Sequence, residues 1–272
     1  MLCFWGSDTL EIIESFIKGK KTEALCEDAL VVTDSFIAVI DGVTGKSNRV
    51  FDGLSGGKAA AVKACECIEK LPSDIDCFSA VEKITEAVKS LYEDDEPVGA
   101  AAAGAIILSK EKNEIWSIGD CQCIINGEIH KHEKEIDVLL SEVRSLVLEN
   151  EKRNGKTEKE LLLSDTGREF ILPLLKSQHI FANTHGDFSY GVFNGNEIPK
   201  DKIVVYKVKE GDEIVLASDG YPYLKENLEE SESLLQEEIK NNPLCDGDFK
   251  STKGLVDGNN SFDDRTYIRF IV

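Results

Sequence analysis

The chain has 272 residues, of which 51 are acidic and 31 are basic, so its formal net charge is −20 at pH 7. Such a surface repels the phosphates of nucleic acids and anionic lipids, so we expect neither nucleic acid nor membrane as a partner. The length is sufficient for one domain with a full core, and eight cysteines without a signal-peptide pattern favour a cytoplasmic protein with reduced thiols.

The first part of the chain predicts strands. Two are expected at Thr9–Lys18 and Ala29–Val32, and a third follows in the five apolar residues Phe36–Ile40. Asp41 and Gly42 end this third strand. Rigid backbone holds a carboxylate at such a strand tip, and the glycine leaves its own carbonyl approachable, so the position is favourable for a metal ion.

The spacing of apolar residues then changes to the helical period and later returns to the pattern of strands. The expected elements are a helix from Gly56 to Pro72, a helix over about Asp74–Tyr92, strands at Val98–Ser109 and Glu114–Ile118, and a hairpin at Asn126-Gly127.

A helical segment at about 133–178 interrupts the run of strands, and we interpret it as an insertion in a single domain of 272 residues. Its expected helices are Glu133–Asn150, Glu158–Leu163 and Arg168–Lys176, the last interrupted by Pro173. Strands at His179–Asn183, Phe188–Phe193, Ile203–Val208 and Ile214–Ser218, a helix at Glu229–Lys240 and a strand at Thr266–Val272 complete the chain. Because strict alternation of strand and helix is absent, we expect an antiparallel α+β sandwich.

Acidic residues recur where the apolar strands end. Asp41, Asp120 and Asp219 each follow an apolar run and each lie beside a glycine. One such strand end is weak evidence of a site, since Asp and Gly are common turn residues. Three in one chain are harder to dismiss as simple turns.

The order of acidic motifs resembles that of the metal-dependent protein phosphatases of the 2C family, most closely the bacterial type, from about Lys18 to the C-terminus. The motifs are Glu27-Asp28, Asp41-Gly42, Gly119-Asp120, Asp219-Gly220 and Asp263-Asp264. The stretches Gly99–Ile107 and Asp212–Gly220 are similar to two strands of that family. The resemblance implies a four-layer α/β/β/α sandwich of two antiparallel sheets flanked by helix pairs.

The resemblance also implies two Mg²⁺ or Mn²⁺ ions per chain, and in some members a third. Such ions prefer carboxylate, carbonyl and water oxygens. The implied catalytic residues are Asp41, Asp219 and Asp263. The implied metal-binding residues are Glu27, Asp41, Gly42, Asp120, Asp219 and Asp263, and Asp28 and Asp264 would support them without binding a metal ion. A hydroxide bridging the two ions would attack phosphoserine or phosphothreonine in a phosphoprotein substrate.

One departure concerns substrate binding. The family usually has a phosphate-binding arginine four residues before Glu27, and here that residue is Glu23. Lys20, Lys21 and Arg49 are the candidates to replace it, although lysine lacks the bidentate geometry of arginine. Two alternatives therefore stay open: a weakly active or inactive homologue that regulates a partner, and a phosphatase of small molecules. We expect a monomer.

Overall fold

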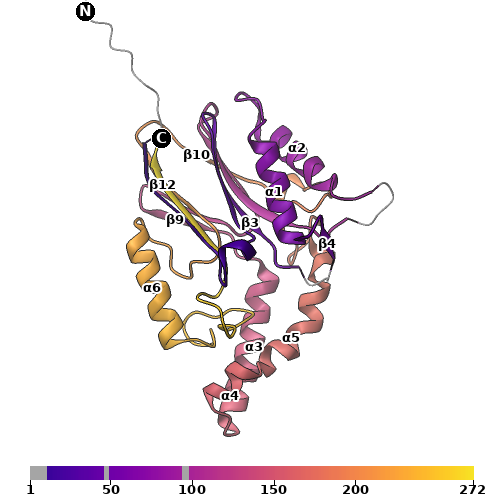
Figure 1. Cartoon of the computed structure of the whole chain (residues 1–272), viewed down its shortest axis with the longest axis vertical. Coiled ribbons are helices and arrows are strands. Elements are labelled where there is room, and N and C mark those ends of the chain that lie inside the picture. Colours follow the sequence, from indigo (N-terminus) through magenta and orange to yellow (C-terminus); the bar gives the residue numbers. More distant parts are fainter. Residues whose placement is uncertain (1–10, 46–48, 94–97) are drawn as a thin grey trace, which may run out of the picture.

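The computed structural model describes residues 11–45, 49–93 and 98–272 of the chain. Two antiparallel sheets face each other, as Figure 1 shows. In spatial order the first sheet contains β1 (Glu11–Lys18), β12 (Arg265–Ile271), β11 (Glu213–Ala217), β8 (Gln122–Ile125) and β9 (Glu128–Lys131). The second contains β10 (Val204–Lys207), β7 (Glu114–Ile118), β6 (Ala103–Ser109), β3 (Phe36–Gly42) and β2 (Ala29–Val32).

Strand β3 is apolar from Phe36 to Ile40 because both of its faces are covered. Ile37 and Val39 point into the core between the two sheets, whereas Ala38 and Ile40 belong to the core beneath the helices. This division follows the two-residue period of a strand. The covering helices are α1 (Gly56–Ile68) and α2 (Cys77–Lys89), which lie together on the outside of the second sheet (Figure 1).

The outer face of the first sheet has a different cover. Tyr221 and Leu224, which follow β11, pack with Val215 and Tyr267 of the sheet, and Leu228 at the start of α6 (Leu228–Asn241) packs against the same cluster. The predicted α+β class with two antiparallel sheets is thus confirmed. A short hairpin of β4 (Val50–Phe51) and β5 (Leu54–Ser55) precedes α1.

The helical segment between β9 and β10 extends from one end of the sandwich (Figure 1). It contains α3 (Glu135–Arg153), α4 (Glu158–Leu163) and α5 (Thr166–Ser177). Ile136 and Leu140 of α3 pack against Ile171 and Leu175 of α5. Because this packing holds both halves of α5, the helix continues through Pro173, and the predicted interruption is wrong.

Two of the predicted strands are wrong as well. The first, at His179–Asn183, is largely a 3₁₀ helix, Gln178–Phe181. The second, at Phe188–Phe193, forms only isolated bridges. The side chain of Asn183 explains the loss of a ladder, since it donates to the carbonyl oxygens of Val192 and Asn196 and thereby satisfies backbone groups locally.

The strand expected from Val98 begins only at Ala103. Before it, the backbone amides of Gly99 and Ala101 donate to the hydroxyl of Tyr92 rather than to a neighbouring strand. Residues Thr9 and Leu10 of the first expected strand lie outside the described residues.

The seven described cysteines are all free thiols. Within the described ranges, no helix combines the length and apolar character needed to cross a membrane.

Candidate metal centre

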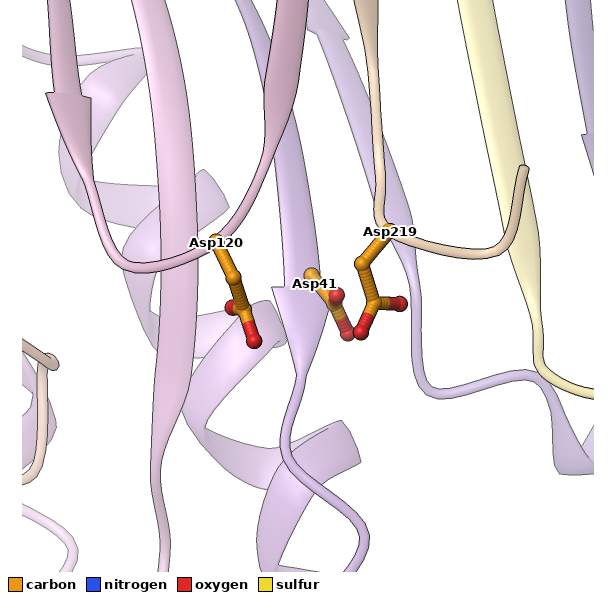
Figure 2. A group of neighbouring side chains, drawn as sticks. All are labelled: Asp41, Asp120 and Asp219. Carbon is orange, nitrogen blue, oxygen red and sulfur yellow. The ribbon is translucent and has the colours of Figure 1, made fainter. Parts of the chain in front are cut away.

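Three carboxylates from three chain segments converge at one end of the sandwich. Asp41 is at the end of β3, Asp120 is in the turn between β7 and β8, and Asp219 follows β11. Figure 2 shows the three side chains pointing the same way. One oxygen from each lies within 4.8 Å of the others. The sequence-predicted convergence of these strand ends is therefore present in the structure.

Glycines permit this arrangement. A Cβ on Gly42 would lie 2.5 Å from the carbonyl oxygen of Glu27 and 2.8 Å from the carbonyl oxygen of Gly57, so only glycine lets these segments approach. Gly119 has a φ of +93°, a conformation that other residues rarely adopt. It turns the chain after β7 and thereby directs Asp120 toward Asp41.

The acidic cluster is unfavourable when it holds no cation. Loss of solvation and the negative charge of Asp219 raise the pKa of Asp41 well above its usual value. Loss of solvation, followed by the charges of Asp120 and Asp263, raises the pKa of Asp219 to about 7. A divalent cation would relieve this repulsion. Since all the donors are oxygens, the residues present fit a hard ion such as Mg²⁺ or Mn²⁺.

Asp263 lies beside this cluster but is paired with lysines. Lys20 Nζ donates to Asp263 Oδ1 at 2.7 Å, and Lys253 Nζ donates to Asp263 Oδ2. Burial opposes ionisation of Asp263, but the charges of Lys253 and Lys20 prevail and hold its pKa well below the usual range. The three-carboxylate cluster found among the described residues thus omits Asp263, which sequence reasoning grouped with Asp41 and Asp219.

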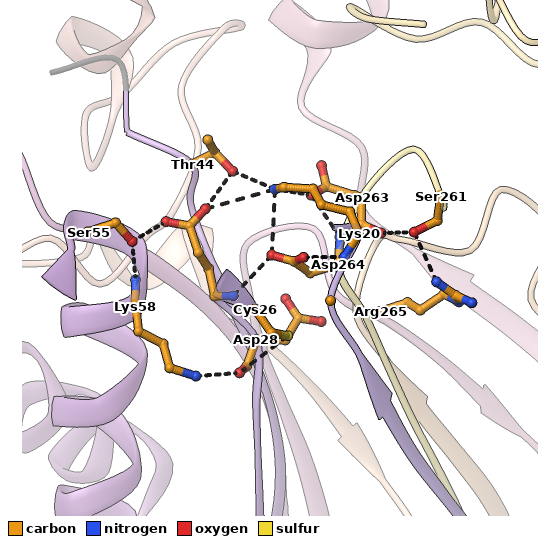
Figure 3. A network of polar contacts seen from close by, with 12 residues as sticks. Lys20, Cys26, Asp28, Thr44, Ser55, Lys58, Ser261, Asp263, Asp264 and Arg265 are labelled. Atoms are coloured by element: carbon orange, nitrogen blue, oxygen red, sulfur yellow. Dashed lines mark hydrogen bonds and ion pairs between the residues drawn. The ribbon is translucent and has the colours of Figure 1, made fainter. Parts of the chain in front are cut away.

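Behind these residues lies a hydrogen-bond network, shown in Figure 3. The two carboxylate oxygens of Glu27 accept from Thr44 at 2.7 Å and from Ser55 at 2.5 Å. Asp264 accepts from the backbone amides of Lys20 and Glu27, at 2.7 Å and 3.0 Å. The predicted residue Glu27 is therefore held in place on both sides.

Asp28 is buried under the same network. It accepts a hydrogen bond from Thr266 Oγ1 at 2.9 Å. Burial raises its pKa to about 8, and the nearby charges of Asp219 and Asp264 add to this effect. The protonation of Asp28 is therefore linked to the charge of the cluster, although Asp28 does not line the cavity.

The carboxylates open into a cavity of about 950 Å³. One wall comes from α3 and α5, and another from loop 247–256. Eight of the residues that line this cavity are acidic, and six basic side chains lie among them. The basic residues are Lys20, Lys131, Lys134, Arg168, Lys250 and Lys253.

Arg144 fixes the loop wall to the helical segment. Its guanidinium group is fully buried and donates to Asp165 at the start of α5, at 3.0 Å and 2.7 Å. The same group donates to the carbonyl oxygens of Cys245 and Ser251, at 3.2 Å and 3.0 Å. The loop that carries Lys253 therefore depends on α3 and α5 for its position.

Of the three candidates for phosphate binding, the structure brings only Lys20 to the cavity. Lys21 is exposed and does not line it. The guanidinium group of Arg49 lies over the rings of Phe51 and Tyr92, at 4.7 Å and 5.0 Å. Arg49 is likewise not among the residues of the lining.

Sequence reasoning missed Lys134, Lys253 and Arg168 in the lining. Each lies in a loop or helix without a recognisable motif, and each reaches the cavity through the packing of the helical segment. Periodicity and spacing carry no information about that packing.

Comparison with known proteins identifies the fold. No family profile and no curated protein matches the chain. Among solved structures, it is similar to the catalytic domain of the serine/threonine protein phosphatase PstP in complex with two manganese ions, with 16% identity, a TM-score of 0.53, and coverage of 97% of this chain and 99% of that one.

Two further structures are comparably similar. A bacterial serine phosphatase has 13% identity and a TM-score of 0.52, covering 97% of this chain and 98% of that one. Serine/threonine phosphatase Stp1 from Staphylococcus aureus has 14% identity and a TM-score of 0.51, covering 98% and 96%. The chain therefore has the fold of the metal-dependent serine/threonine phosphatases, and the resemblance to the 2C family that its sequence indicates is confirmed at the level of the fold.

Proposed function

We propose that the chain is a metal-dependent phosphatase that hydrolyses phosphate monoesters, with phosphoserine and phosphothreonine in proteins as its substrates. The observation that carries this proposal is the convergence of Asp41, Asp120 and Asp219 within 4.8 Å in a cavity that lysine side chains also reach. The carboxylates suit a hard divalent cation, and Lys20 and Lys253 at the same cavity suit the phosphate of a substrate.

Asp41 and Asp219 would hold the cations, with the Gly42 carbonyl as a further ligand and Glu27 and Asp263 nearby. When bound, Mg²⁺ or Mn²⁺ would polarise a phosphoryl oxygen of the substrate and lower the pKa of water toward neutrality. PstP, whose fold this chain shares, was solved with two manganese ions. That structure supports two ions per chain here.

Lys20 and Lys253 would bind the substrate phosphate in place of the missing arginine. Both Nζ atoms contact Asp263 at the edge of the cavity, and their side chains are 18% and 21% exposed. A lysine acts on phosphate as a point charge rather than as a bidentate fork, so two lysines compensate for one arginine.

The proposal is tested by turnover of an aryl phosphate and of phosphoserine peptides after treatment with EDTA, with and without added Mn²⁺. Asp41→Asn preserves the size of the side chain and removes its charge, and it should lower the Mn²⁺-dependent rate by at least ~100-fold. Asp74→Asn, at an exposed site outside the cavity, is the matched control. A wild-type protein without Mn²⁺-dependent turnover on either substrate would refute the enzyme and favour the partner-binding regulator.

A further inference from the structure

Lys134 places a positive charge inside the candidate metal centre. It is the residue immediately before α3, and its Nζ donates to Asp120 Oδ2 at 2.7 Å. The ammonium group also lies 5.2 Å from the centre of the Tyr190 ring, a favourable cation–π distance. The side chains of Lys134 and Asp120 are only 11% and 20% exposed, so solvent screens their attraction weakly.

The three carboxylates of the cluster differ in this respect. Within the part of the chain that the structure describes, Asp120 has an ion pair with lysine, whereas Asp41 and Asp219 have none with lysine or arginine. Lys134 thus engages one of the two carboxylate oxygens of Asp120, Oδ2. A divalent cation placed there would be repelled by the ammonium group.

We propose that Lys134 is a tethered cation that closes Asp120 to divalent metal ions, so that metal binding at this centre is confined to the side of Asp41 and Asp219. The helical segment supplies this cation, because Lys134 is the residue immediately before α3. The inference rests on the proposed function, since it concerns the same metal centre. It assigns to the helical segment a role in setting how many metal ions the chain holds.

The test is the number of Mn²⁺ ions bound by EDTA-treated protein, measured by titration calorimetry and by the electron paramagnetic resonance signal of free Mn²⁺. Lys134→Gln removes the ammonium group and should bind one Mn²⁺ more per chain than the wild type. Lys134→Arg retains a positive charge beside Asp120 and should bind the wild-type number. Lys131→Gln is the control for loss of a nearby charge, because Lys131 pairs with Glu133 instead.

A Lys134→Gln protein that binds the same number of ions as the wild type would overturn the inference, whatever that number is. Asp120→Asn gives a second measurement that does not depend on the folding of Lys134→Gln. If Lys134 closes Asp120, this variant keeps the wild-type number of ions, and loss of one ion would contradict the inference. Turnover of aryl phosphate by the wild type tests the proposed function separately, so the two failures are distinguishable.

Discussion

Replacement of Arg144 by methionine should destabilise the protein strongly. Methionine keeps the apolar stem but removes the guanidinium donor from Asp165 and from the carbonyl oxygens of Cys245 and Ser251, although Asp165 and Cys245 retain the backbone amides of Arg168 and Ser251. Breaking a buried ion pair costs ~3–5 kcal/mol. Because the Asp165 side chain is 21% exposed and regains some hydration, we expect the lower end, ~3 kcal/mol. For a chain of this size that loss corresponds to a decrease in Tm of about 6–12 °C.

The assay is thermal unfolding followed by circular dichroism, with Arg153→Met as the control. Arg153 is on the same helix and pairs with Glu149, but its side chain is 79% exposed, so its loss should cost at most ~0.5 kcal/mol. Limited proteolysis should also cut loop 247–256 faster in Arg144→Met than in the control. If Arg144→Met lowers Tm no more than Arg153→Met, the loop is not held as described.

Two further predictions concern pH and the substrate. Burial raises the pKa of Asp28 to about 8 and loss of solvation raises that of Asp219 to about 7, so the folded metal-free protein retains protons that the unfolded chain releases near pH 4. Its Tm should therefore decrease between pH 6.5 and pH 8, and saturating Mn²⁺ should remove this dependence; a Tm that increases with pH in EDTA would contradict the assignment. Lys20→Ala should raise KM for phosphopeptides at least ~10-fold because it removes a charge from the phosphate site, whereas Lys21→Ala should leave KM unchanged. Equal KM values for the two variants, measured by steady-state kinetics, would show that Lys20 does not bind the phosphate.

The acidic strand ends were predictable from sequence for a physical reason. A buried strand has a period of two and ends abruptly at Asp-Gly, so the positions of Asp41 and Asp219 follow from local patterns alone. Facing sheets then bring these ends together. Lys20 became a candidate through the resemblance to the 2C family, as a possible replacement for the phosphate-binding arginine where this chain has Glu23.

The other features of the site depend on long-range packing, which local sequence patterns do not predict. Lys134 and Lys253 reach the site through the helical segment and through the loop that Arg144 fixes, and neither arrangement has a local pattern. The sequence grouped Asp263 with Asp41 and Asp219, but its pairing with two lysines could not be predicted. The strand expected near Asn183 failed because a side-chain amide replaced a backbone ladder.

The position of β12 determines when the centre can form during synthesis. This strand lies between β1 and β11, and it is the only described partner of β1 in the sheet. Asp263 and Asp264 immediately precede it, and Asp264 holds the backbone of Glu27 in place. Until residues 265–271 leave the ribosome, β1 and one edge of β11 therefore remain unpaired, and such edges are prone to aggregation. The metal centre is thus assembled only after residues 265–271 have been made, which also makes the folding dependent on slow, long-range contacts.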